Sequence, residues 1–172
     1  MKIVLLGYMG CGKTTIGKKL SNSLYLDFTD LDQYIEKREQ KTISEIFNER
    51  GEIHYRKIES NYLKEFIDEH DSYVLSLGGG TPCYGKNMEE IMSHRDIISI
   101  YLQASIQTLC QRLSKNRSKR PLLSSLSEHQ LAEYIGKHLF ERIPFYEKAR
   151  YKVFTNSKDK NTIVTEIRIK LH

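Results

Sequence analysis

Residues 7–14 read Gly7-Tyr8-Met9-Gly10-Cys11-Gly12-Lys13-Thr14, which fits the pattern Gly-x-x-x-x-Gly-Lys-Ser/Thr. The run 2–6 before this stretch is short and apolar, as in a buried parallel strand, and residues 15–20 after it can open a helix. Glycines at these positions let the backbone curl until successive N–H groups point into one concavity. Strand, glycine turn and helix N-terminus together predict a cradle for the phosphates of a nucleoside triphosphate.

This phosphate loop, residues 7–14, ends in a cationic and a hydroxyl side chain. Lys13 can reach the β- and γ-phosphates as a point charge, and the Thr14 hydroxyl is placed to ligate Mg²⁺. Cys11 is expected to serve as a small residue, with an oxidation-sensitive thiol as the alternative. The nucleotide-binding residues predicted here are Gly10, Cys11, Gly12, Lys13, Thr14 and Thr15.

The composition predicts a globular chain with one core. Its 172 residues suffice for a single domain, 1–172, in which 39% of residues are hydrophobic and 28% are charged. No run approaches the roughly 18 apolar residues of a membrane helix. The first predicted strand starts so early that it leaves no room for a targeting segment. We therefore expect a cytoplasmic protein with no membrane partner, acting as a monomer.

Basic residues outnumber acidic ones, 27 to 22, which gives a net charge of +5. A basic balance suits anionic ligands. Because the basic residues are scattered and are not interleaved with aromatic ones, we expect small anionic molecules and no nucleic acid. The cysteines have no metal-ligand spacing and are expected to be reduced thiols.

Apolar runs alternate with helical patterns along the chain. Strands are predicted at residues 2–6, 24–28, 73–77, 97–102 and 151–154. The stretch Thr42-Ile43-Ser44-Glu45 has the pattern of a capping box, opening a helix that ends near Gly51. Further helices are predicted at residues 31–38, 55–66 and 163–171. The alternation predicts a parallel sheet covered by helices on both faces.

Two acids follow the second predicted strand, and ligands bind beyond such strand ends in open parallel sheets. Asp30 and Asp32 are separated by one residue, so an extended backbone would point both into one pocket. One could hold Mg²⁺, directly or through water, while the other accepts a proton or hydrogen bond from a hydroxyl group. The alternative is an N-cap and a first-turn acid for the helix at 31–38.

Glycines and arginines supply the other candidate site residues. Residues 78–80, all glycine, follow the third predicted strand and suit either a close approach of the backbone to a ligand or a plain turn. Arg56 precedes Glu59 by three helical positions, so the acid can orient the guanidinium. Arg142 directly precedes Ile143-Pro144-Phe145-Tyr146. Arginine can bind a carboxylate in bidentate fashion, although each arginine alone is more often a surface residue.

These motifs occur in an order and spacing that resemble those of shikimate kinases, over roughly residues 1–160. They are the phosphate loop, Asp30-x-Asp32, Phe47…Gly51-Glu52…Arg56…Glu59, Gly78-Gly79-Gly80, Arg120-Pro121-Leu122-Leu123 and Arg142-x-Pro144-x-Tyr146. The resemblance implies an α/β P-loop NTPase fold of the NMP-kinase-like type: a five-stranded parallel sheet flanked by helices, with a mobile lid at about 114–126. It implies ATP-dependent phosphorylation of the 3-hydroxyl of shikimate, on the route to chorismate and aromatic amino acids.

The resemblance also implies how an acceptor site for shikimate is built. Asp32 would bind substrate hydroxyls and could serve as the general base. Arg56 and Arg142 would grip the shikimate carboxylate. Gly79, flanked by Gly78 and Gly80, would offer its backbone to the substrate.

On the donor side, the resemblance implies ATP with Mg²⁺. Asp30 would support the ion, through water, beside Thr14. Arg120, in the lid, would fold over the phosphates and join Lys13 and Asp32 as a catalytic residue. Shikimate kinases often carry an arginine seven residues before the lid Arg-Pro, where it packs on adenine. This chain has Leu113 there, with Arg112 or Arg117 as substitutes and Lys158 as the match for a second basic residue near adenine.

Two other functions stay open at this point. One is a different small-molecule kinase of the same architecture, such as a gluconate or nucleoside-monophosphate kinase. The other is a nucleotide-binding switch, but a GTPase-type switch would need an Asn-Lys-x-Asp signature. The nearest stretch, Asn156-Ser157-Lys158-Asp159, has the wrong order.

Overall fold

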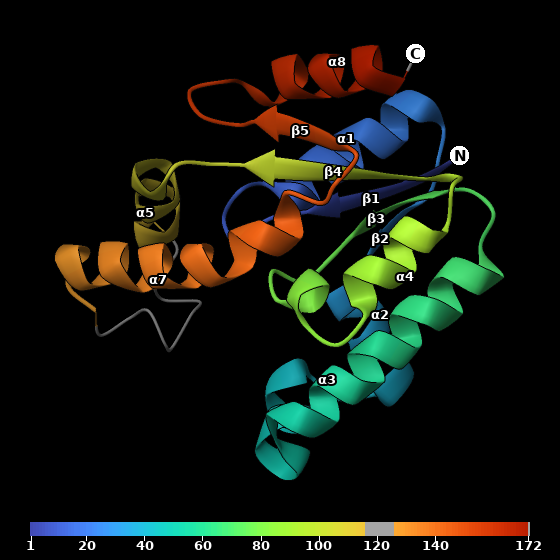
Figure 1. The fold of residues 1–172 in the computed structure, drawn as a ribbon, viewed down its shortest axis with the longest axis horizontal. Helices are drawn as coiled ribbons and strands as arrows, with labels where there is room; N and C mark the ends of the chain where they lie inside the picture. The colour runs from blue at the N-terminus through green and yellow to red at the C-terminus, as the bar shows by residue number, and fades with distance from the viewer. Residues whose placement is uncertain (116–125, 172) are drawn as a thin grey trace.

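The computed structural model describes residues 1–115 and 126–171, which form a five-stranded parallel sheet with helices around it (Figure 1). The strands are β1 (Lys2–Leu6), β2 (Phe28–Asp30), β3 (Tyr73–Ser76), β4 (Ile97–Gln103) and β5 (Tyr151–Phe154). Their order is β2-β3-β1-β4-β5, so β1 is central. Val4 of β1 pairs with Leu75 of β3 on one side and with Ser99 of β4 on the other.

Helices connect the strands and cover the sheet. They are α1 (Lys13–Leu24), α2 (Leu31–Glu39), α3 (Ile43–Glu69), α4 (Asn87–Ser93), α5 (Ile106–Ser114), α7 (Glu128–Tyr146) and α8 (Lys160–Leu171), with a 3₁₀ turn η1 (Thr81–Cys83). Helix α1 packs on β1, β2, β3 and α8, and α4 packs on β4 and α3. In Figure 1 both chain termini lie at the end of the sheet opposite the arrowheads of β4 and β5. The predicted fold class is confirmed.

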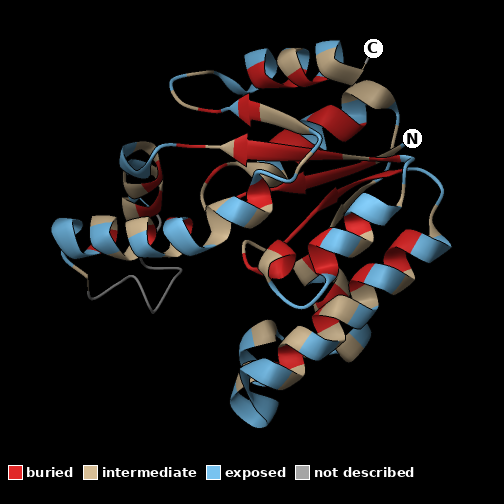
Figure 2. Ribbon diagram, in the orientation of Figure 1, coloured by how far each residue is buried: buried red, intermediate tan, exposed pale blue. Residues whose placement is uncertain are grey.

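The core lies in the sheet and on the helix faces turned toward it (Figure 2). All four residues of β3 are buried, as are the last four of β1, as expected for parallel strands covered on both faces. Helix α8 buries Ile163 and Ile167, two members of the predicted helical pattern. No helix among the described residues is both long enough and apolar enough to cross a bilayer.

The second strand is shorter and later than predicted. We expected residues 24–28, but β2 is Phe28–Asp30, because Leu24 is the last residue of α1. Tyr25 then caps the helix in a left-handed conformation (φ 56°, ψ 41°), and its side chain is 97% exposed. The correction matters for the site because it makes Asp30 the last residue of a strand that pairs with β3.

Helix α3 begins and bends where its sequence predicts. The Thr42 hydroxyl accepts a hydrogen bond from the Glu45 N–H, and the Glu45 carboxylate accepts one from the Thr42 N–H, which completes the predicted capping box. Helical geometry is interrupted at Gly51 (φ 79°, ψ 171°), a left-handed φ that favours glycine, and then resumes to Glu69. The second segment carries Tyr55, Arg56 and Glu59 to the ends of the neighbouring strands.

Candidate functional site

A single cleft brings together most of the predicted site residues. It has a volume of about 1460 Å³ and includes the segments that follow β1, β2 and β3. The predicted residues that line it are Gly10, Cys11, Gly12, Lys13, Thr14, Thr15, Asp30, Asp32, Arg56, Gly78, Gly79, Gly80, Arg142 and Lys158. Arg120, most of the predicted lid at 114–126, and Arg117 lie outside the described residues.

The phosphate loop forms the turn between β1 and α1. Gly7, Gly10 and Gly12 all have positive φ, and Gly12 occupies the N-cap of α1 (φ 109°). A Cβ at Gly7 would lie 2.6 Å from the Leu102 carbonyl oxygen. Gly12 has no side chain to cap α1, and the first turn of α1 holds no acid. The residues of that turn line the cleft and bring to it the positive end of the helix dipole. Phosphate is the ligand that such an end binds.

Lys13 and Thr14 lie at the start of α1 with their polar atoms in the loop. The Lys13 ammonium donates to the carbonyl oxygens of Gly7 (2.7 Å) and Tyr8 (3.2 Å). The Thr14 hydroxyl donates to Asp30 Oδ2 over 3.0 Å. Asp30 holds the N-cap position of α2 and Asp32 lies in its first turn, as the alternative predicted, but the Asp30 carboxylate makes no capping bond and instead accepts a hydrogen bond from the Thr14 hydroxyl. A hydroxyl and a carboxylate side by side are oxygen donors of the kind Mg²⁺ takes.

Asp32 stands in the first turn of α2, surrounded by acids. The pKa of its carboxyl group is raised from 3.8 to about 6, chiefly by burial and then by the negative charges of Asp30 and Glu59. The Tyr55 hydroxyl, which donates to Asp32 Oδ1 over 3.2 Å, and the Lys13 ammonium act in the opposite direction. Asp32 is therefore a carboxylate that can take up a proton near neutral pH.

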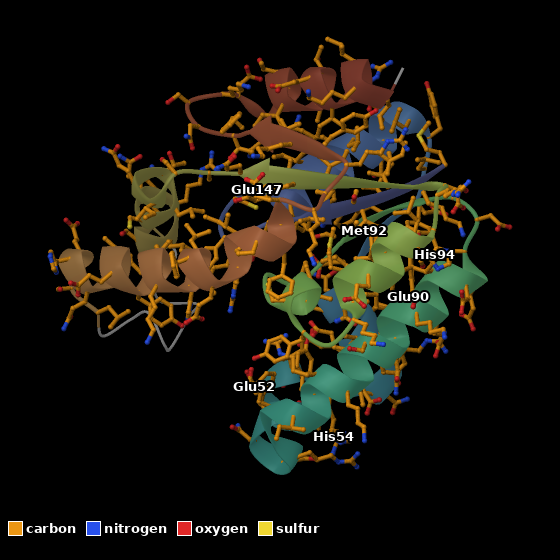
Figure 3. The ribbon with its side chains drawn as sticks, viewed as in Figure 1. Glu52, His54, Glu90, Met92, His94 and Glu147 are labelled. Carbon is orange, nitrogen blue, oxygen red and sulfur yellow. The ribbon has the colours of Figure 1, made fainter. Side chains whose placement is uncertain are left out.

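Arg56 is held by the acid that its spacing predicts. Its Nη1 donates to Glu59 Oε2 over 2.9 Å, and the Glu59 side chain is only 1% exposed. Glu52, labelled on α3 in Figure 3, lies 3.5 Å from Arg56 Nε. The guanidinium also lies over the Tyr84 ring, 4.1 Å from its centroid. These contacts fix the guanidinium beside the cleft.

Two of the three glycines after β3, Gly78 and Gly80, are approached closely by side chains of the cleft. A Cβ at Gly80 would lie 2.8 Å from Arg56 Nη2, and one at Gly78 would lie 2.9 Å from both Asp32 Oδ1 and Thr81 Oγ1. Gly79 has more room, at 3.4 Å from the Met9 nitrogen and 3.5 Å from an Arg142 Nη1. None of the three has a positive φ. Gly78 and Gly80 therefore do more than form a plain turn, since Asp32 and Arg56 approach their backbone closely.

Replacing Gly78 with alanine should lower the free energy of unfolding by about 1–3 kcal/mol, because the new methyl group would displace Asp32 and Thr81. Urea unfolding measures this change. The matched control is Gly136→Ala in α7, where the added methyl meets only the Ile106 Cδ1 at 3.6 Å, and we expect it to be neutral or stabilising. A Gly78→Ala variant as stable as the wild type would contradict the packing argument.

Arg142 approaches the cleft from α7, across from Arg56. Its guanidinium lies 5.5 Å from the centroid of the Tyr8 ring. The Tyr8 hydroxyl is within 3.1 Å of His138 Nδ1, one helical turn before Arg142. Tyr146, the last residue of α7, donates its hydroxyl to the Gly79 carbonyl oxygen. Within residues 1–115 and 126–171, no carboxylate forms an ion pair with Arg142.

Of the two arginines predicted to contact adenine in place of Leu113, the structure describes Arg112 but not Arg117. Leu113 is buried, and its side chain packs where a Cβ on Gly10 would be, 3.1 Å away. Arg112 donates to the carbonyl oxygens of Gly10, Cys11 and Thr155, so it links the phosphate loop to the segment after β5. Lys158 also lines the cleft and pairs with Glu166. Arg112 therefore holds the phosphate loop in place through hydrogen bonds to its backbone.

Sequence reasoning missed some polar residues of this region: Tyr8, Tyr55, Thr81, His138 and the loop-supporting role of Arg112. The sequence places Tyr55 only as the first residue of the helix predicted at 55–66, and its hydroxyl contacts depend on how α2 packs against α3. A tyrosine beside Arg56 and four residues before Glu59 is the one signal the sequence carried.

Comparison with known proteins identifies what this arrangement is similar to. The family model for shikimate kinase matches residues 9–172. A shikimate kinase of Flavobacterium psychrophilum is 48% identical over 166 residues, which are 96% of both chains. A crystal structure of shikimate kinase from Bacteroides thetaiotaomicron superposes with a TM-score of 0.92 at 37% identity, over 99% of this chain and 98% of the other. Shikimate kinase from Acinetobacter baumannii, solved in complex with shikimate, gives 0.86 at 31% identity, over 99% and 92%.

Proposed function

The chain belongs to the shikimate kinase family, and from this membership we propose how its residues divide the reaction between them. As a member of the family, it is a transferase that phosphorylates shikimate with ATP, in the biosynthesis of aromatic amino acids. The 3-hydroxyl is the proposed acceptor. The observation that carries the proposal is one cleft that contains both a phosphate cradle and two arginines beside an acid.

In the donor half, the N–H groups at residues 10–15 and the Lys13 ammonium bind the β- and γ-phosphates of ATP. Lys13 sits on the carbonyl oxygens of Gly7 and Tyr8, within the curve of the loop, which supports this role. Thr14 and Asp30 would hold Mg²⁺, because the hydroxyl of one and the carboxylate of the other lie side by side and are both oxygen ligands. When bound, the ion neutralises charge on the phosphate oxygens.

In the acceptor half, Arg56 and Arg142 bind the carboxylate of shikimate from α3 and α7. Two guanidinium groups on separate helices fix a small hydroxy acid in orientation as well as in place. The backbone of Gly79 lies beside Arg142, and because its carbonyl oxygen accepts a hydrogen bond from the Tyr146 hydroxyl, its N–H is the group that it would offer to the substrate. Phosphoryl transfer depends mainly on such positioning and on charge stabilisation.

Asp32 receives the proton of the acceptor hydroxyl. It lines the cleft between the phosphate loop and Arg56, and its raised pKa, about 6, suits a base that works near neutral pH.

We further propose that the chain is one kinase domain whose lid, at about 114–126, carries Arg120 onto the phosphates. The cytoplasmic location, the monomeric state and the absence of nucleic-acid and membrane partners stay predictions.

A coupled assay of ADP release tests the proposed function. With ATP and Mg²⁺ we expect turnover that depends on shikimate, little turnover with gluconate or a nucleoside monophosphate, and loss of turnover with EDTA that added Mg²⁺ restores. Phosphorus NMR of the product would show whether the 3-hydroxyl is the acceptor. A lack of shikimate-dependent turnover would exclude the shikimate kinase activity. Preferential turnover of another acceptor would favour a different small-molecule kinase of the same architecture.

A further inference from the structure

Tyr55 lies between two carboxylates that the proposed reaction uses for different purposes. Its hydroxyl donates to Asp32 Oδ1 over 3.2 Å and is 3.4 Å from Glu59 Oε1. The residue is only 3% exposed, and its ring packs on Phe47 with centroids 4.7 Å apart. The hydroxyl is therefore held at the contact between α2 and α3.

Glu59 is the other end of this connection. It is fully buried and accepts hydrogen bonds from Thr81 Oγ1 (2.6 Å) and Arg56 Nη1 (2.9 Å). A continuous polar chain thus runs from Asp32 through Tyr55 and Glu59 to Arg56. A tyrosine hydroxyl has a single proton and donates it to one acid at a time; the shorter contact is the one to Asp32, while the same oxygen lies against Glu59.

We propose that Tyr55 is a positioning residue: its hydroxyl fixes the Asp32 carboxylate relative to the Arg56–Glu59 pair. This inference rests on the proposed function, in which Asp32 receives the hydroxyl proton and Arg56 binds the carboxylate of the same substrate. Rotation about the last bond of an aspartate side chain is loosely restrained, so a buried hydrogen bond is needed to hold one orientation. Small misplacements of a reacting group lower rates steeply.

Tyr55→Phe tests the proposal because it keeps the ring packed on Phe47 and removes only the hydroxyl. We expect kcat to fall about tenfold, with KM for ATP unchanged, because the phosphate cradle is untouched. The matched control is Tyr73→Phe, at the far end of β3 from the cleft. The Tyr73 hydroxyl is buried, with no hydrogen-bond partner in the described part of the chain, and its removal should leave kcat unchanged.

Thr81→Val tests whether Tyr55 positions Asp32 or only supports the structure around Glu59. Thr81 donates to Glu59 and, among the described residues, has no hydrogen bond to Asp32, so its removal should raise KM for shikimate and lower kcat less than Tyr55→Phe does. Near-unchanged melting temperature with a tenfold loss of kcat in Tyr55→Phe supports the proposal. A Tyr55→Phe enzyme with wild-type kcat, or the same kinetic pattern in both variants, overturns it. Wild-type enzyme without shikimate turnover would instead refute the proposed function.

Discussion

Asp32→Asn should reduce kcat by about 10²–10⁴-fold, the range over which a general base contributes to catalysis. Asparagine keeps the shape of the side chain and can still accept a hydrogen bond from the substrate hydroxyl. It cannot take the proton. We therefore expect KM for shikimate and KM for ATP to change only a few-fold, and steady-state kinetics with each substrate varied in turn measures both.

The structure explains why this single atom change should matter so much. Asp32 is the acid whose pKa is raised to about 6, by burial first and then by Asp30 and Glu59, while it stays hydrogen-bonded to Tyr55. The control is Asp71→Asn in the exposed turn before β3, which removes the same charge away from the cleft and should leave kcat unchanged. A loss of kcat below about tenfold together with a raised KM for shikimate would mean that Asp32 only orients the hydroxyl.

Features fixed by neighbouring residues in the chain were predictable from the sequence. The phosphate loop, the capping box of α3 and the break at Gly51 depend on contacts within a few residues, and each lies where the sequence predicts it. The pairing of Arg56 with Glu59 is also local, because three positions along a helix bring two side chains together.

The error at β2 arose where local patterns are ambiguous. Leu24, Tyr25 and Leu26 form a short apolar run like that of a strand, but the first of them completes the apolar face of α1. A short apolar run does not distinguish the end of a buried helix from a strand. Tyr25 in the left-handed conformation, rather than a glycine, ends the helix, so the usual stop signal was missing.

Contacts between distant segments were beyond sequence reasoning. Gly78 and Gly80 are needed because Asp32 and Arg56, on other elements, pack against them. Arg112 was expected to contact adenine, because Leu113 occupies the position where shikimate kinases often carry an arginine. Its bonds to Gly10 and Cys11 depend on how α5 meets the phosphate loop. Such contacts follow from the packing of the whole fold and carry no local pattern.

Replacing either arginine of the acceptor site should lower kcat/KM for shikimate by roughly 10²-fold, since truncating one partner of a charged hydrogen-bonded pair costs about 2–5 kcal/mol. KM for ATP should stay nearly constant for both Arg56→Ala and Arg142→Ala, because neither residue belongs to the phosphate loop. Arg95→Ala, an exposed residue before β4, removes the same charge and serves as the kinetic control. Equal effects on both substrates would contradict the carboxylate clamp.

The two arginine variants should differ sharply in stability. Arg56→Ala leaves Glu59, 1% exposed, without its cation, and breaking a buried ion pair from one side typically costs about 3–5 kcal/mol of unfolding free energy. Arg142 rests on the Tyr8 ring and has no such acid among the described residues, so Arg142→Ala should cost less than about 1 kcal/mol. Urea unfolding of both variants measures the difference. If Arg142→Ala is destabilised as much as Arg56→Ala, Arg142 is a structural residue and the acceptor site holds the substrate carboxylate with Arg56 alone.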